Sequence, residues 1–310
     1  MSVIEQKAGS PKRRLGDLVF ANLTFGSGLL ILVALAGVAI FLTIQGIPGF
    51  SAKAADLDGH ANFIAYVWPL VFGTLLAAAI ALLIALPLAM GVALSISHYA
   101  PRRLAVVIGY LVDLLAAVPS VVYGLWGISF LGPRLAPLYG WLGTHLSWIP
   151  LFKGPALNSG RTILTAAIVL AIMILPIITA ISREIFMQTP RLNEEAALAL
   201  GATRWEMIRL SVFPYAKSGI VSAAMLGLGR AMGETMAVAM VLSATGIVSF
   251  NLISATNPST IAANIALKFS DSTGVQVNAL IASGLVLFVI TFIVNFAARA
   301  IVSRGDVRNK

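Results

Sequence analysis

The sequence predicts an all-α, polytopic membrane protein with six transmembrane helices. Three observations support this: 59% of the 310 residues are hydrophobic, only 11% are charged, and the apolar residues fall into six runs. A soluble domain is usually about a quarter charged, and a membrane-spanning helix needs roughly 20 mainly apolar residues. We expect residues 1–310 to form one transmembrane domain, with spans at about 18–44, 68–97, 104–131, 162–182, 220–245 and 279–301.

The first predicted span follows three basic residues, Lys12–Arg14, and so has the outline of a signal peptide. However, no charged residue occurs from Leu18 to Ala52. The apolar core of a signal peptide has only about 7–15 residues. We therefore expect an uncleaved span.

The next three predicted spans each contain a proline, namely Pro87, Pro119 and Pro176. Proline removes a backbone hydrogen bond and bends a helix. Membrane helices tolerate this where neighbouring groups satisfy the freed carbonyl. We expect continuous but kinked spans.

The fifth predicted span contains Arg230 and Glu234, which would lie about 6 Å apart along one face of a continuous helix. Ionisable groups at bilayer depth cost at least ~2.5–3.5 kcal/mol each on insertion scales, so they tend to pair with one another. In one interpretation Arg230 lines a substrate path, and Glu234 holds it until an anion competes. In the other, the two residues form a structural ion pair that fixes helix packing.

Asp113 in the third predicted span offers Arg230 a second possible partner, unless it lies near the cytoplasmic mouth beside Arg102 and Arg103. A guanidinium presents a planar fork that matches the oxygens of phosphate. Arg230, Glu234 and Asp113 are therefore the candidate pathway residues, and the choice of carboxylate partner stays open. Small residues near the pair permit close helix contact, namely Gly227, Gly229 and Gly233.

The sixth predicted span makes the number of crossings even, so both termini lie on one side. That side has fifteen basic residues against five on the other, which marks it as cytoplasmic. The net charge of +9 follows from this bias and suits anionic lipid; no continuous basic face suggests nucleic acid. The fifteen residues are Lys7, Lys12, Arg13, Arg14, Arg102, Arg103, Arg183, Arg191, Arg204, Arg209, Lys217, Arg299, Arg304, Arg308 and Lys310.

Three outer loops are expected at about 46–66, 132–161 and 246–276. Trp141 and Trp148 in the middle loop suit either an aromatic belt at the membrane interface or a docking surface for an outside partner.

The cytoplasmic loop 183–217 carries the signals of two short helices. Thr189-Pro190 suits the start of the first helix, and Gly201 suits the position after its end. Thr203-Arg204-Trp205-Glu206 matches a capping box that starts the second. Its apolar residues either dock into a groove on another protein or fold back onto the membrane helices; these residues are Trp205, Met207 and Ile208.

This loop resembles the coupling loop of ABC importer inner-membrane permeases, whose pattern is E-A-A, three residues, G, nine residues, I-x-L-P. Here Glu195-Ala196-Ala197 and Gly201 match at that spacing, and Ser211-Val212-Phe213-Pro214 stands at the end. Ser211 and Phe213 depart from the pattern. The resemblance implies a type I ABC importer permease architecture. It also implies an ATPase-coupling loop that includes Glu195, Ala196, Ala197, Gly201, Trp205 and Pro214.

Two further segments, 115–127 and 229–238, resemble signatures of phosphate-specific permeases. Chain length and outer loops resemble the PstC-type subunit more than its PstA-type partner. The resemblance implies a permease subunit of an ATP-driven phosphate importer in a bacterial inner membrane. Its implied partners are a PstA-type permease, a PstB-type ATPase dimer and a PstS-type extracytoplasmic phosphate-binding protein. An ABC permease for sulfate, molybdate or phosphonate, and an ion-driven secondary anion transporter, are the alternatives.

The sequence suggests no catalytic, metal or cofactor site. None of the seven lysines follows a glycine, so the phosphate-binding loop G-x-x-x-x-G-K-[ST] cannot occur and ATP hydrolysis falls to a separate chain. There is no cysteine, and the three histidines are far apart in sequence: His60, His98 and His145.

Overall fold

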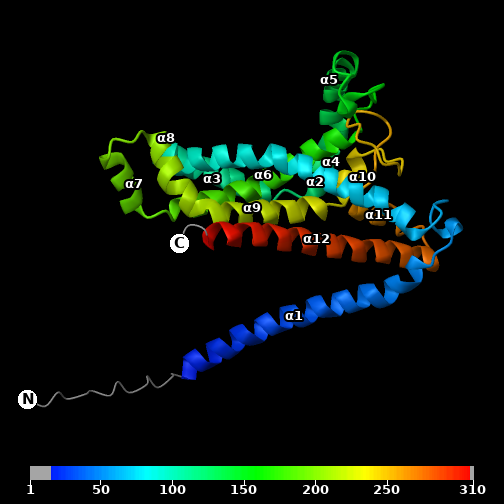
Figure 1. Cartoon of the computed structure of the whole chain (residues 1–310), viewed down its shortest axis with the longest axis horizontal. Coiled ribbons are helices and arrows are strands. Elements are labelled where there is room, and N and C mark those ends of the chain that lie inside the picture. Colours follow the sequence, from blue (N-terminus) through cyan, green and yellow to red (C-terminus); the bar gives the residue numbers. More distant parts are fainter. Residues whose placement is uncertain (1–14, 308–310) are drawn as a thin grey trace, which may run out of the picture.

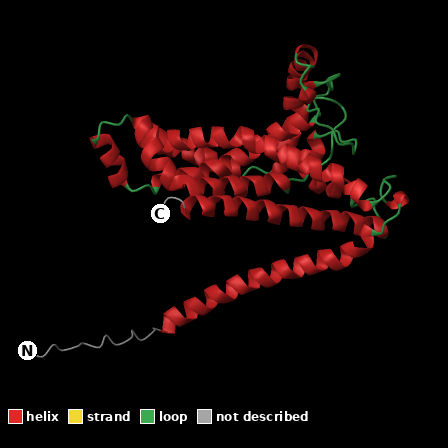
Figure 2. Cartoon of the chain, viewed as in Figure 1, coloured by secondary structure: helices red, strands yellow, loops and turns green. Residues whose placement is uncertain are grey.

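The protein is helical over the part of the chain that the computed structural model describes, residues 15–307, where no β-strand is formed. Figures 1 and 2 show the helices in a bundle, with α1 diverging from it. The all-α prediction is therefore confirmed for these residues. Several basic residues used to predict orientation lie outside the described residues, namely Lys7, Lys12, Arg13, Arg14, Arg308 and Lys310.

Four helical segments within residues 15–307 are long and apolar enough to cross a membrane: 16–50, 63–99, 163–187 and 275–300. They contain α1 (Leu15–Phe50), α2 (Phe63–Leu94), α6 (Ile163–Met187) and α12 (Val275–Val307). These match the first, second, fourth and sixth predicted spans, each extended by several residues. A bent helix pair at the third predicted span raises the number to five, and the sixth crossing stays a prediction.

The third predicted span is not continuous. It divides into α3 (Arg102–Ala116) and α4 (Ser120–Trp126), and a π-helical turn joins α4 to α5 (Gly132–His145). The two halves meet at 91°. The expectation of a mere kink was wrong because Pro119 has an extended backbone, with φ −59° and ψ 139°, and disfavours helix in the residue before it.

A continuous helix would pair the Leu115 carbonyl with an N–H at position 119, which proline lacks. That carbonyl instead accepts hydrogen bonds from the Val118 N–H at 3.3 Å and from the Tyr123 hydroxyl at 2.9 Å. A side chain of α4 thus satisfies the last turn of α3, as broken helices in a membrane require.

The fifth predicted span is also broken. α9 (Phe213–Met232) ends at Gly233, and the short α10 (Met236–Val241) follows. The prediction of one helix over residues 220–245 was therefore wrong at both ends. Toward its N-terminus, α9 is preceded without interruption by a π-helical turn, Ile208–Val212, and by α8 (Arg204–Met207).

The core lies where α2, α6 and α9 pack together. α2 presents a stripe of fully buried alanines at every fourth residue, which allows the helices to approach closely: Ala77, Ala81, Ala85 and Ala89. A methyl group at Gly227 of α9 would lie 2.8 Å from Ile178 of α6, so the predicted close contact at Gly227 is confirmed. Gly229 has no such neighbour within 4 Å.

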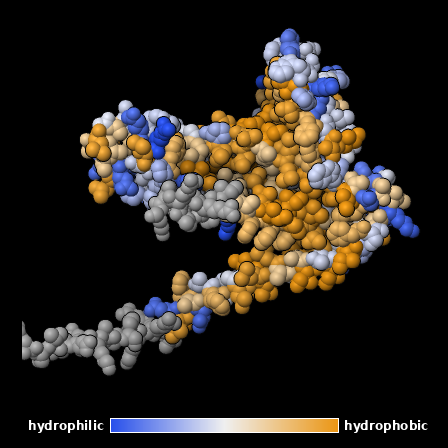
Figure 3. Space-filling view, in the orientation of Figure 1, coloured by the Kyte–Doolittle hydropathy of each residue, from blue (hydrophilic) through white to orange (hydrophobic). Residues whose placement is uncertain are grey.

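α1 contacts the rest of the molecule mainly through its last turns, against α12 (Figure 1). A methyl group at Gly49 would lie 2.5 Å from the Asn278 carbonyl, so the two helices meet closely there. Figure 3 shows hydrophobic side chains over the visible faces of α1 and α12, with hydrophilic residues gathered at α7–α8 and around the loops at the opposite end. An apolar surface between two hydrophilic ends suits a protein that spans a bilayer.

The predicted outer loops hold more helix than expected. The loop at 132–161 contains α5, and the loop at 246–276 contains α11 (Ile261–Lys268). Trp141 and Trp148 are largely exposed, which suits both of their predicted roles. These loops lie at the end of the bundle opposite to α7 and α8 (Figure 1).

A buried asparagine joins the segments at this end. Asn257 accepts a hydrogen bond from the Ile163 N–H at 3.1 Å, and its amide donates to the Ser243 carbonyl at 3.1 Å. The start of α6 and the chain that leaves α10 are thereby held together.

Candidate functional site

The loop at 183–217 forms the predicted pair of short helices, α7 (Arg191–Ala199) and α8. Gly201 follows α7 with φ +87°, a conformation that favours glycine. Its N–H bonds the Leu198 carbonyl at 3.0 Å, and the Ala202 N–H bonds the Ala197 carbonyl at 3.2 Å. These two bonds make the Schellman motif, so the predicted end of the helix is confirmed.

The predicted start of α7 is displaced by one residue. Pro190 occupies the capping position, with φ −60° and ψ 122°, rather than the first helical position. The Thr189 hydroxyl does not cap the helix and instead lies buried without a hydrogen-bond partner. Prediction of Thr189 as the cap was therefore wrong.

The capping box of α8 is confirmed. The Glu206 N–H donates to the Thr203 hydroxyl at 3.3 Å, and the Thr203 N–H donates to the Glu206 carboxylate at 2.8 Å. The Thr203 hydroxyl also donates to that carboxylate. Hydrogen bonds from the Thr203 backbone and then its side chain lower the pKa of Glu206 below its usual 4.5.

The apolar residues of the loop divide between the two predicted roles. Met207 and Ile208 are buried against Ala93 of α2 and Phe186 of α6, so they hold the loop on its own membrane helices. Trp205 is 54% exposed and Leu200 is 90% exposed. The second pair leaves apolar surface free at the tip of the loop.

The residues that match the coupling pattern lie mostly on the surface. Glu195, Ala196, Gly201 and Pro214 are exposed, and Ala197 is partly buried.

Two contacts bind α7 to the membrane helices. His98, in the π-helical turn Ser95–Tyr99 that follows α2, lies 3.4 Å from Glu194, and the Ser211 hydroxyl donates to the Asn193 carbonyl at 3.1 Å. Sequence reasoning missed His98 because 96 residues separate it from Glu194.

The predicted Arg230–Glu234 pair is not formed. Arg230 lies in the last turn of α9, whereas Glu234 lies beyond the end of that helix. The Glu234 side chain is buried and accepts a hydrogen bond from the Ala237 N–H at 3.0 Å, at the start of α10. Because the helix breaks at Gly233, the Glu234 carboxylate binds a nearby backbone N–H rather than the Arg230 guanidinium.

Asp113 does not pair with Arg230 either. Its carboxylate lies 3.7 Å from the guanidinium of Arg183 on α6. Arg183 passes over Gly109 of α3, where a methyl group would collide with its side chain. Both predicted partners of Arg230 are thus wrong, and no sequence pattern predicted the Asp113–Arg183 contact.

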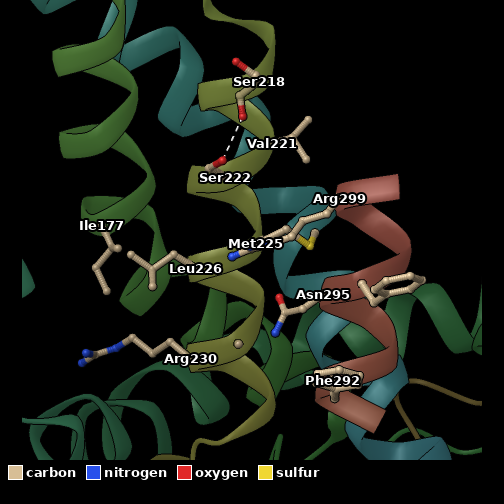
Figure 4. Close-up of a pocket in the computed structure, with 12 residues that line it drawn as sticks. Ile177, Ser218, Val221, Ser222, Met225, Leu226, Arg230, Phe292, Asn295 and Arg299 are labelled. Carbon is tan, nitrogen blue, oxygen red and sulfur yellow. Dashed lines mark hydrogen bonds between the residues drawn. The ribbon is translucent and has the colours of Figure 1, made fainter. Parts of the chain in front are cut away.

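Arg230 instead borders a cavity of about 1110 Å³ between α6, α9 and α12. Figure 4 shows Asn295 and Arg299 of α12 reaching toward α9, whereas the Arg230 side chain, further along α9, points away from α12. Ser218 and Ser222 line the cavity on α9. The sequence did not identify Asn295 as a site residue. Arg299 was counted only among the basic residues that predict the cytoplasmic side.

The two segments that resemble phosphate-permease signatures meet in the fold, because α4 packs on α10. A methyl group at Gly124 would lie 3.0 Å from the Ala237 Cα atom, and one at Gly127 would lie 2.7 Å from Val241. Gly124 and Gly127 therefore serve the packing of the broken helices.

Comparison with known proteins agrees with this architecture. A family model described as "Binding-protein-dependent transport system inner membrane component" matches residues 85–306. Phosphate transport system permease protein PstC 2 of Mycobacterium tuberculosis is 46% identical over 303 residues, covering 94% of this chain and 93% of the relative. PstC of Mesorhizobium japonicum is 39% identical, covering 95% and 92%.

The fold is also similar to a solved bacterial ABC transporter involved in the import of the acidic polysaccharide alginate. The TM-score is 0.59 at 16% identity, with 93% of this chain and 99% of the other covered. This likeness concerns the fold alone. From the matched residues and the extent of the similarity, the chain belongs to the family of binding-protein-dependent transport system inner membrane components and has PstC permeases among its relatives.

Proposed function

We propose that this chain is the PstC-type permease subunit of an ATP-driven phosphate importer. The observation that carries the proposal is 46% identity to PstC 2 over 94% of the chain. A cavity beside Arg230, bordered by α6, α9 and α12, supports it. A guanidinium suits phosphate because its donors match the oxygens of the anion two at a time.

Arg230 is the pathway residue in this proposal. No carboxylate lies within 4.0 Å of its guanidinium among residues 16–300, whose side chains the structure describes. An incoming anion therefore does not have to displace Glu234, contrary to the mechanism suggested by the sequence. Glu234 acts indirectly, by holding the start of α10 through the Ala237 N–H.

The loop formed by α7 and α8 is the coupling element. α8, the π-helical turn and α9 form one uninterrupted helical segment from Arg204 to Met232, which changes direction between α8 and α9 (Figure 1). The helical path from Arg204 to Arg230 is about 39 Å long, at 1.5 Å per residue. Displacement of the loop by an ATPase would therefore be carried directly to the cavity.

The proposed complex has four kinds of subunit. A PstA-type permease completes the path, a PstB-type ATPase dimer engages Leu200 and Trp205, and a PstS-type protein delivers phosphate from outside. Both termini are proposed to be cytoplasmic. ATP hydrolysis belongs to the ATPase subunits, so this chain itself is not an enzyme.

Competition during uptake tests the substrate. The co-expressed complex should accumulate labelled phosphate only when ATP is supplied, and unlabelled sulfate, molybdate or phosphonate should compete weakly. Strong inhibition by one of these anions, with its own ATP-dependent uptake, would assign the permease to that anion instead. Uptake that follows an ion gradient without ATP would indicate a secondary transporter.

A further inference from the structure

The last helix contributes two polar side chains to the cavity beside Arg230. Asn295 and Arg299 are four residues apart on α12, so they share one face about 6 Å apart along the axis. Both are exposed to the cavity side. Figure 4 shows the two side chains directed from α12 toward α9.

The cavity has a positive lining without an acidic counterpart. Its twelve lining residues include Arg230 and Arg299 but no aspartate or glutamate. Arg299 has no carboxylate within 4.0 Å in the described part of the chain. Since an uncompensated guanidinium at membrane depth is costly, such a lining favours an anion.

The polar residues are spread along the cavity rather than gathered at one point. Figure 4 shows Arg299 beside Met225, and Met225 precedes Arg230 by about 7 Å along α9. Ser222 and Ser218 continue in the same direction, toward the end of the molecule that carries α7 and α8. The Ser222 hydroxyl already donates to the Ser218 carbonyl at 3.0 Å. Among the described residues, the cavity-lining side-chain donors besides Arg230 that make no hydrogen bond are the Arg299 guanidinium, the Asn295 amide and the Ser218 hydroxyl.

We propose that Arg299 and Asn295 form a second oxyanion subsite, which receives phosphate after Arg230 on its way to the cytoplasm. This inference rests on the proposed function for the identity and direction of the transported anion. Two weak sites in series let an anion bind well enough to enter and still leave. The guanidinium supplies charge and a planar fork, and the amide supplies a neutral donor.

The same donor set would also suit the phosphate group of an anionic lipid. The experiment therefore uses the complete permease–ATPase complex in nanodiscs of zwitterionic lipid alone and in discs with added anionic lipid. Equilibrium binding of labelled inorganic phosphate is measured without ATP or binding protein. The variants are Arg299→Gln, Arg299→Lys and Asn295→Leu. Arg103→Gln, an exposed change on α3 outside the cavity, is the matched control.

In zwitterionic discs, Arg299→Gln should weaken phosphate binding about tenfold or more, as expected for loss of a charge-assisted hydrogen bond. Arg299→Lys should recover part of that loss, because it keeps the charge but not the fork. Asn295→Leu should have a smaller effect, and Arg103→Gln should bind phosphate as the native complex does. Native affinity in Arg299→Gln would overturn the subsite. If Arg299→Gln only reduced the amount of bound anionic lipid and left phosphate binding unchanged, the subsite would also be overturned, and Arg299 would be a lipid-binding residue.

Uptake is measured in parallel to separate this inference from the proposed function. If the native complex accumulates no phosphate with ATP and binding protein, the proposed function fails. The binding measurement still decides the subsite in that case, since it requires neither transport nor ATP. If native uptake is normal and Arg299→Gln leaves both uptake and binding unchanged, only the subsite fails.

Discussion

Single residues whose role depends on the adjacent backbone were predictable from the sequence. Gly201 was expected after the end of α7 and has φ +87°, and the Thr203–Glu206 capping box is formed as expected. Both follow from rules that act within a few residues. Partners of Arg230 were not predictable, because they depend on whether the helix continues past Gly233.

A change at Gly201 should disturb coupling through strain. A side chain there meets nothing within 4 Å, so Gly201→Asp should cost about 1 kcal/mol from the left-handed backbone and add charge at the proposed ATPase contact. ATP-dependent uptake should fall while the membrane helices stay folded. Unchanged uptake, at matched membrane levels, would remove the loop from coupling.

Glu206 should make the start of α8 sensitive to acid. Because its pKa is lowered in the folded loop, its contribution to stability is present above the usual value of 4.5 and is lost as pH falls through the lowered value. Amide hydrogen exchange at Thr203 and Glu206 should therefore be slow at pH 7 and, after correction for intrinsic rates, less protected in acid. Glu206→Ala should lose that protection at pH 7 and weaken ATPase association.

Glu206→Gln is the matched control, since glutamine also serves in a capping box. It should retain protection at pH 7 without the acid dependence. Equal protection in Glu206→Ala and the native chain would show that the box does not stabilise α8.

Among elements, the positions of the helices were predictable but their continuity was not. Long apolar runs gave α1, α2, α6 and α12 because hydropathy alone determines such segments. The breaks at Pro119 and Gly233 depend on contacts across the fold. The Tyr123 hydroxyl satisfies Leu115 at the first break, and Glu234 starts α10 at the second.

Packing between α4 and α10 should be intolerant of added volume. A methyl group at Gly127 would lie 2.7 Å from Val241 and 2.8 Å from Val169, so Gly127→Val should destabilise the permease by about 1–3 kcal/mol. A lower thermal unfolding midpoint of the purified complex would show this. Gly91→Ala, in α2 where a methyl group meets nothing within 4 Å, is the control and should not lower the midpoint. Equal midpoints in the Gly127 variant and the native chain would contradict the tight contact.

At the scale of the whole molecule, one continuous helical segment connects the loop at one end with the open cavity bordered by α6, α9 and α12. α8, the π-helical turn and α9 run from the capping box at Thr203 to Arg230 without a break. Met207 and Ile208 hold the start of this segment against α2 and α6. The break at Gly233 lies beyond its end and separates it from α10, which packs on α4.

The central claim is that Arg230 meets phosphate on the transport path, and uptake by a neutral variant tests it most directly. ATP-dependent uptake of labelled phosphate would be compared for the native complex, Arg230→Gln and the control Arg103→Gln at matched membrane levels. We predict that Arg230→Gln loses uptake while assembly and basal ATP hydrolysis stay intact, and that Arg103→Gln transports normally. Normal uptake by Arg230→Gln would contradict the account and leave Arg230 a structural charge.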